Sequence, residues 1–110
     1  MGKGKPEHLH GALDLLILRC LSIESMHGWG ISKYIQHVSE GLLEVNQGSL
    51  YPALYRLEDQ GWIQAEWGQA PSGRRAKVYS LTRSGAKQLD QELLDWSAFS
   101  TAVHRVLGIA

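Results

Sequence analysis

The chain has 110 residues, of which 44% are hydrophobic and 20% charged, so we expect one folded domain, and wholesale disorder is excluded. Basic and acidic residues balance at 11 each, yet residues 67–89 contain five basic side chains and no acidic one, which indicates a local site for an anionic partner. The single cysteine excludes an intrachain disulfide framework and no apolar run is long enough to span a bilayer, so we expect a soluble, cytoplasmic protein without a membrane partner.

The N-terminal part is predicted to consist of a flexible tail over residues 1–8 and a helix over residues 9–24. The apolar residues of this helix form two stripes, the first of Leu9, Leu13, Leu16 and Cys20 and the second of Ala12, Leu15 and Ile23. A helix with two apolar faces needs two packing partners, and we expect one of them to belong to another subunit.

Two further helices are predicted over residues 28–40 and 46–60, because apolar residues recur in both at the spacing of one helix face. These residues are Ile31, Tyr34, Ile35 and Val38 in the first helix and Leu50, Ala53, Leu54 and Leu57 in the second. Gly41 and Gly61 follow the last turns, where a left-handed glycine commonly ends a helix.

The start of the helix over residues 46–60 carries two signals that partly conflict. Asn46 or Ser49 is suited to cap its N-terminus with a side-chain oxygen. Pro52 removes a backbone donor and crowds the preceding turn, so the first turn is predicted to be irregular or the helix to begin late.

A β-hairpin is predicted next, because residues 62–67 and 77–81 alternate between apolar and polar side chains. The intervening residues contain Gly, Pro and Ser and are predicted to form a loop with a basic tip. We expect Trp62 and Trp67, which frame the first strand, to have packing roles, and Trp29 likewise.

A long last helix is predicted over residues 83–107, with Thr82 as its N-cap. Its apolar positions are spaced alternately by three and four residues, as in the seam of a coiled coil: Ala86, Leu89, Leu93, Trp96, Ser100, Val103 and Leu107. At ~1.5 Å per residue the helix would be about 37 Å long, more than the width of so small a domain. We therefore expect it to pack on another chain; the alternative is a core helix of this chain with a frayed end.

This order of elements is that of a winged helix-turn-helix domain. Two motifs resemble the recognition helix and the wing of the PadR family of transcriptional regulators: GSLYPALYRLE at residues 48–58 with Gly61, and GRRAK at residues 73–77 with YSLT at residues 79–82 and Gly85. HGW at residues 27–29 resembles the family's His-Gly-Tyr start of the second helix, with Trp in place of Tyr. The single C-terminal helix resembles the short subgroup of the family.

The resemblance implies a mainly α fold with a small β-hairpin, a winged helix-turn-helix with a long C-terminal dimerisation helix. Residues 9–82 would form the DNA-binding domain and residues 83–110 the dimerisation helix. In such a fold the helix over residues 46–60 enters the major groove of DNA. With its apolar stripe inward, we expect Gln47, Ser49 and Tyr51 near base edges, and Tyr55 and Arg56 at phosphates or flanking bases. The alternative for both tyrosines is packing on the hairpin.

The basic tip of the hairpin lies beside the recognition helix in this fold. We therefore expect Arg74, Arg75 and Lys77 to reach a row of phosphates or the minor groove. The alternative is a hairpin tip that is merely solvated.

The resemblance also implies a homodimer in which the last helix packs on the first helix of the partner subunit. The residues expected at this interface are Leu9, Ala12, Leu15, Leu89, Leu93, Trp96, Val103 and Leu107. Some short PadR-type proteins hold planar hydrophobic molecules between interface aromatics, and the resemblance makes Trp96 and Phe99 candidate residues for such an effector. The alternative is an ordinary packed interface tryptophan.

The predicted function is that of a homodimeric repressor that binds double-stranded DNA at a pseudo-palindromic operator, with a small hydrophobic effector as a candidate ligand. No catalytic constellation and no cluster with metal-ligand spacing is identifiable, so we expect neither an enzyme nor a cofactor or metal site. The alternatives are a small-molecule-binding protein without a primary DNA role and a winged-helix module that binds protein.

Overall fold

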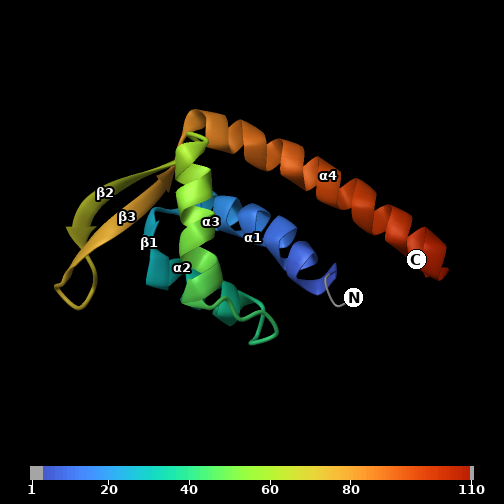
Figure 1. Cartoon of the computed structure of the whole chain (residues 1–110), viewed down its shortest axis with the longest axis horizontal. Coiled ribbons are helices and arrows are strands. Elements are labelled where there is room, and N and C mark those ends of the chain that lie inside the picture. Colours follow the sequence, from blue (N-terminus) through green and yellow to red (C-terminus); the bar gives the residue numbers. More distant parts are fainter. Residues whose placement is uncertain (1–3, 110) are drawn as a thin grey trace.

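The computed structural model describes the backbone of residues 4–109 and the side chains of residues 12–109. Within that range the chain forms four helices and a three-stranded antiparallel sheet (Figure 1): α1 (Gly4–Ile23), β1 (Met26–His27), α2 (Gly28–Val38), α3 (Gln47–Asp59), β2 (Ile63–Gln69), β3 (Arg75–Leu81) and α4 (Arg83–Leu107). The predicted fold class, mainly helical with a small hairpin and a long last helix, is confirmed. Helix α1 begins at Gly4, before the predicted start at Leu9, whose side chain lies outside the described residues.

Three helices begin with a side chain that accepts a hydrogen bond from a backbone amide of the first turn. Asn46 Oδ1 accepts from the Ser49 amide at 2.9 Å, and Thr82 Oγ1 accepts from the Gly85 amide at 3.0 Å, as predicted for Asn46 and Thr82. His27 Nδ1 caps α2 in the same way, accepting from the amide three residues on at 3.1 Å. A histidine cap was not predicted, because histidine is not among the usual capping residues.

Pro52 lies inside α3, which continues through it, so the prediction of an irregular first turn or a late start is wrong. The hydrogen bond that Pro52 forgoes is the one to the Gly48 carbonyl in the first turn. Helix α3 thus lacks a single backbone hydrogen bond near its N-terminus and continues without a break to Asp59.

The sheet has the strand order β1-β3-β2, and the hairpin of β2 and β3 forms the wing. Its register runs from Ile63 opposite Leu81 to Gln69 opposite Arg75, so both strands extend further toward the tip than alternation predicted. Strand β1 pairs with β3 through two residues only and was not predicted, because a two-residue strand has no readable period.

The core is centred on α1, which packs against α2, α3, α4 and β3. Leu13, Ile17 and Leu18 of α1 are fully buried. Cys20 joins them, as expected of a small core residue. Burial raises the pKa of the Cys20 thiol to about 11, so the thiol stays protonated and unreactive at neutral pH.

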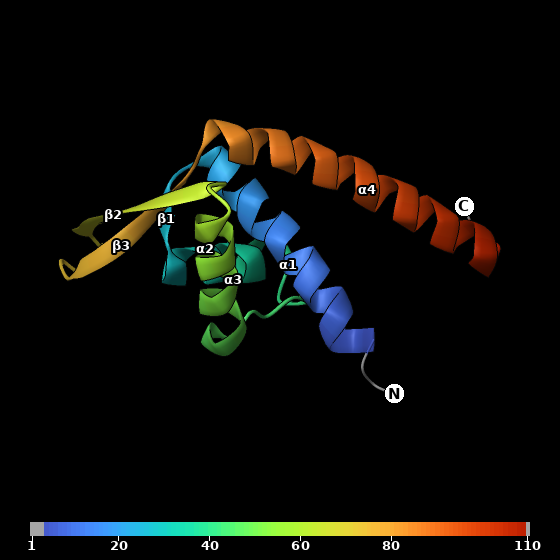
Figure 2. The same cartoon turned by 45° about the horizontal axis from the view of Figure 1, so that its top comes forward.

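Helix α4 leaves this core and projects from it (Figures 1 and 2). Leu89 in its second turn is buried against the chain's own core, whereas Leu93, Trp96 and Leu107 further along are 46%, 48% and 63% exposed. The apolar seam predicted for this helix is therefore divided: Leu89 belongs to the core of this subunit, whereas Leu93, Trp96 and Leu107 further along are only partly covered by the described part of the chain.

The junction between the wing and α4 is held at one point by several hydrogen bonds. The Thr82 amide donates to the Trp62 carbonyl at 3.0 Å, and the hydroxyls of Thr82 and Ser84 both donate to the Gly61 carbonyl, at 2.7 and 3.0 Å. A Cβ at Gly85 would lie 1.9 Å from the Trp62 carbonyl oxygen, so only glycine fits there. The first turn of α4 is thus fixed to the base of the hairpin.

Candidate nucleic-acid interface

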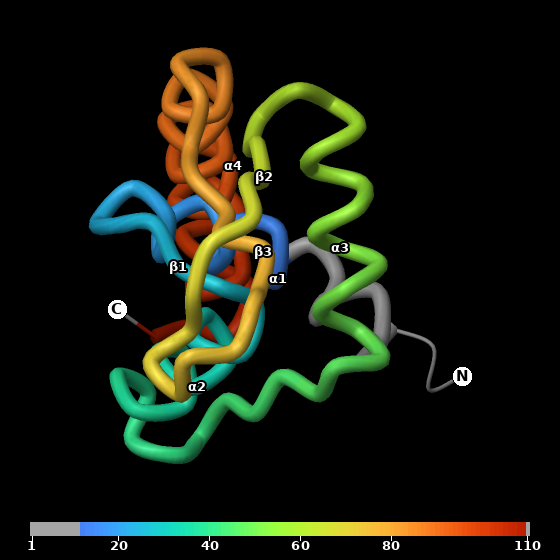
Figure 3. Tube along the Cα trace, turned by 90° about the vertical axis from the view of Figure 1, so that its left-hand side faces the viewer, coloured from blue at the N-terminus to red at the C-terminus, as the bar shows by residue number. Residues whose placement is uncertain are grey.

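An open cleft of about 650 Å³ lies between the start of α2, one side of α3 and the inner face of the wing. Figure 3 shows the backbone of the hairpin, α3 and α2, the elements whose residues line the cleft. The predicted binding residues among those that line it are Tyr51, Tyr55, Arg74, Arg75 and Lys77. The fold therefore brings together the predicted tyrosines of the recognition helix and the predicted cations of the wing.

The tyrosines of α3 lie at different depths. Tyr51 is half-buried and its hydroxyl end packs over the start of α2, where a Cβ at Gly28 would lie 2.7 Å from the Tyr51 oxygen. Tyr55 is 58% exposed on the same side of the helix. Tyr79 lies buried between the cleft and the core, where burial, reinforced by the nearby Glu58, raises the pKa of its phenol and keeps it neutral.

The wing tip is a closed turn that presents its cations to the cleft. The Ala70 amide donates to the Arg74 carbonyl and the Gly73 amide donates to the Ala70 carbonyl, each at 2.8 Å. Gly73 has a φ of +88°, which other residues rarely adopt, and Pro71 favours the preceding part of the turn. Arg74 follows this turn, is exposed and lines the cleft.

Two tryptophans near the cleft are exposed, so the prediction that both have packing roles is wrong. Trp29 at the start of α2 is 52% exposed, its ring stacks on that of His27 at 5.9 Å and Lys33 Nζ lies 5.2 Å from its centroid. Trp67 on β2 is 60% exposed, with the Arg75 guanidinium carbon 4.7 Å from its ring centroid. Both aromatic residues carry a cation on their face.

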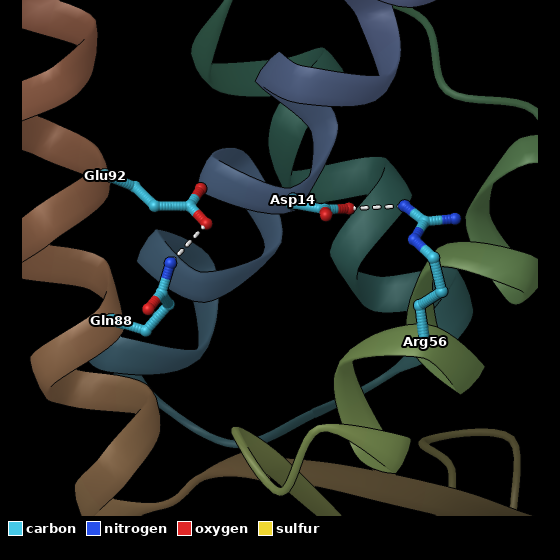
Figure 4. A network of polar contacts seen from close by, with 4 residues as sticks. All are labelled: Asp14, Arg56, Gln88 and Glu92. Carbon is cyan, nitrogen blue, oxygen red and sulfur yellow. Dashed lines mark hydrogen bonds and ion pairs between the residues drawn. The ribbon is translucent and has the colours of Figure 1, made fainter.

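Arg56 does not point into the cleft. Its Nη2 donates to Asp14 Oδ1 at 2.6 Å, so the guanidinium is tied to α1, and Figure 4 shows the two side chains meeting between α3 and α1. In this structure the Arg56 side chain therefore makes a contact that joins the recognition helix to the first helix. Gln47 and Ser49 lie in the first turn of α3, outside the lining of the cleft, with Gln47 exposed and Ser49 half-buried.

The residues predicted for the subunit interface and the effector lie away from the cleft, along α1 and α4. Ala12 and Leu15 of α1 and Val103 of α4 are half-buried. The rings of Trp96 and Phe99 are 6.0 Å apart and about half exposed. The neighbouring polar pair on α4, Gln88 and Glu92, is hydrogen-bonded at 2.9 Å (Figure 4).

Two further observations concern the described residues alone. Among them, no group of three or more His, Cys, Asp or Glu side chains is placed to hold a metal ion. None of the described helices combines the length and the apolar character that crossing a bilayer requires.

Comparison with known proteins gives a consistent result. The family model for the "Transcriptional regulator PadR-like family" matches residues 17–91. The chain is 31% identical to the transcriptional regulator Rv3488 of Mycobacterium tuberculosis, over 93% of this chain and 89% of that protein. It is 33% identical to the transcriptional regulator YqjI of Escherichia coli over 74% of this chain, a match that spans only 38% of YqjI.

Solved structures are similar over nearly the whole chain. A transcriptional regulator from Clostridium thermocellum superposes with a TM-score of 0.82 at 27% identity and covers 90% of this chain and 96% of that one. A PadR-like transcriptional regulator from Bacillus cereus superposes with a TM-score of 0.77 at 29% identity, over 92% of this chain and 96% of that one.

Proposed function

Because the chain belongs to the PadR-like family of transcriptional regulators, we propose that it is a homodimeric repressor that binds a pseudo-palindromic DNA duplex. The observation that carries the proposal is the cleft, where the exposed side of α3 and three cations of the wing lie within reach of one ligand. A duplex offers both partners at once, base edges in the groove and phosphates beside it.

We assign the contacts by element. The first turns of α3, with Gln47, Ser49, Tyr51 and Tyr55, would enter the major groove, and residues 9–82 would form the DNA-binding unit. Arg74, Arg75 and Lys77 would bind phosphates or the minor-groove edge from the wing. Arg56 positions α3 on α1 through Asp14 in this proposal and does not bind phosphate.

The dimer is supported by the exposed seam of α4. Leu93, Trp96 and Leu107 repeat at coiled-coil spacing, and the second stripe of α1 offers a matching apolar face. Residues 83–110 would then form the dimerisation unit, in which Leu89 contributes to the core of its own subunit. Two recognition helices related by a two-fold axis would read half-sites one helical turn apart, about 34–36 Å, or a multiple of that distance.

We further propose that a small hydrophobic effector binds at the subunit interface. Trp96 on the seam and Phe99 beside it are about half exposed, suited to a planar apolar molecule held between subunits. Such a molecule would act by changing the angle between subunits. A compound that quenches Trp96 fluorescence without changing affinity for DNA would instead favour the alternative of a small-molecule-binding protein.

The first experiment is a salt titration of binding to a fluorescent duplex from the upstream region of the protein's own gene. The wild type is compared with an Arg74→Ala/Arg75→Ala double variant and, as a control, with Lys87→Ala, which removes an exposed cation of α4 outside the cleft. We expect steep salt dependence whose log–log slope falls by about 2 in the double variant and stays unchanged in the control.

Two outcomes of this titration separate the alternatives. An unchanged slope in the double variant would remove the wing from the interface and leave a regulator that binds through α3 alone. Absence of binding to this duplex and to nonspecific DNA, even at low salt, would refute the proposal and favour a module that binds protein. Repression itself is tested with a reporter gene behind the same upstream region, where loss of the regulator raises expression.

A further inference from the structure

Trp67 occupies an unusual place on the inner face of the wing. Opposite residues of the hairpin share a face, so the face that begins with Ile63 continues through Ala65 to Trp67, with Lys77 opposite it. Ile63 is buried and Trp67 is 60% exposed, so the strand has passed beyond the core at that point. Core packing therefore does not account for a tryptophan there.

The contact that Trp67 makes is with a cation of the cleft. The Arg75 guanidinium lies 4.7 Å from the Trp67 ring centroid, diagonally across the hairpin from Trp67, and Arg75 also lines the cleft. A guanidinium placed over an indole face still has N–H donors that are not directed at the ring. The stacked arginine therefore remains free to donate to a phosphate, while its long side chain has fewer conformations to lose.

We propose that Trp67 is a positioning residue for DNA binding: its indole holds the Arg75 guanidinium in the wall of the cleft, oriented to meet a phosphate of the duplex. This inference rests on the proposed DNA-binding function and adds to it an ordering step that precedes binding. The energetic role of Trp67 then depends on the presence of Arg75, since the indole acts through the cation and not on the duplex.

The test is a double-mutant cycle on the full-length chain, measured as affinity for the same duplex. Trp67→Leu keeps an apolar side chain and removes the aromatic face, Trp67→Phe keeps an aromatic face, and Arg75→Ala removes the cation. We expect Trp67→Leu to weaken binding by about 2- to 5-fold with little change in salt slope, because the charge is still present. The combined variant should bind no worse than Arg75→Ala alone, and Trp67→Phe should retain most of the affinity.

A second measurement uses the free protein. The ring current of Trp67 should move the Arg75 side-chain proton resonances upfield in the wild type, and this shift should disappear in Trp67→Leu. Thermal unfolding of each variant checks that the fold is retained; if Trp67→Leu does not fold, the cycle is run with Trp67→Phe and Trp67→Thr, a residue favourable in strands.

The outcomes separate this inference from the proposed function. Losses that multiply in the combined variant would overturn the positioning role, because Trp67 would then contact DNA independently of Arg75. Full affinity in Trp67→Leu or in Arg75→Ala would also overturn it while leaving DNA binding intact. A wild type that binds no duplex would refute the proposed function and this inference with it.

Discussion

Two glycines in the first turn of α2 provide a matched pair for testing how closely α2 and α3 approach. A Cβ at Gly28 would lie 2.7 Å from the Tyr51 oxygen and 3.0 Å from two ring carbons, well inside normal contact. A Cβ at Gly30 would meet the nearest atom, His27 Cε1, at 3.4 Å. Neither glycine has a positive φ, so alanine fits the backbone at both positions.

The comparison isolates the steric cost. Replacing glycine by alanine in a helix stabilises a protein by about 0.5–1 kcal/mol through the unfolded chain, and this term is similar in both variants. Gly28→Ala additionally overpacks the contact with Tyr51, which typically costs about 1–3 kcal/mol. Because Tyr51 is half-buried and its ring has the open cleft beside it, we expect the lower half of this range, so Gly28→Ala should be about 1–2 kcal/mol less stable than Gly30→Ala.

Urea unfolding at one fixed protein concentration measures the difference, which corresponds to a shift of roughly 0.5–1 M in the midpoint. The displaced Tyr51 ring should also weaken DNA binding in Gly28→Ala. Tyr51→Phe removes the hydroxyl oxygen, the atom that a Cβ at residue 28 would approach most closely. It should therefore recover most of the lost stability in a Gly28→Ala background. Equal midpoints for the two glycine variants would refute the close approach of α2 and α3 at this point.

The remaining predictions concern the ion pair, the thiol and the seam. Arg56→Met should lower the free energy of unfolding by less than about 1 kcal/mol, because the ion pair with Asp14 is partly exposed. It should leave the salt slope of DNA binding unchanged, and a slope that falls by about one would show that Arg56 binds phosphate. Cys20 should react with a thiol reagent at pH 8 only after the protein unfolds. Because the pKa of its thiol is raised in the folded state, the stability that it contributes should be complete below pH 9.0 and lost as the pH rises toward about 11. Urea midpoints measured across that pH range check this. Leu93→Asp should shift the protein toward monomer in sedimentation velocity, whereas Ala98→Asp, on the opposite side of α4, should not; equal effects would place the subunit contact elsewhere.

Much of the fold was predictable from local signals. The bounds of α4 followed from the Thr82 cap and the repeating seam, and the core stripe of α3 followed from its period. Side-chain burial on the wing was less predictable. Trp67 has the same parity as the buried Ile63, so alternation assigns both to the inner face, but alternation does not indicate where along the strand the core ends.

The candidate site was predictable in its residues more than in its arrangement. The cations of the wing and the tyrosines of α3 were identified from motifs, but the cleft between them depends on the packing of three elements far apart in sequence. Arg56 lies on the outward side of α3, where the sequence alone does not distinguish a contact with water, with DNA or with another helix. Its partner, Asp14, lies 42 residues away on α1, a separation at which no local rule applies.

The fixed junction at Gly61 and Gly85 has a mechanical consequence for target selection. Because hydrogen bonds fix the start of α4 to the base of the hairpin, each subunit of the proposed dimer would act as a lever, with a DNA-reading head of α3 and the wing at one end and an arm of about 37 Å at the other. On such a lever a rotation of about 5° where the arms cross moves the reading head by roughly 3 Å, close to the ~3.4 Å rise of one base pair. A dimer built in this way would distinguish operators whose half-site spacing differs by one base pair. A molecule bound between the two arms would change the distance between the recognition helices and so the spacing that the dimer fits.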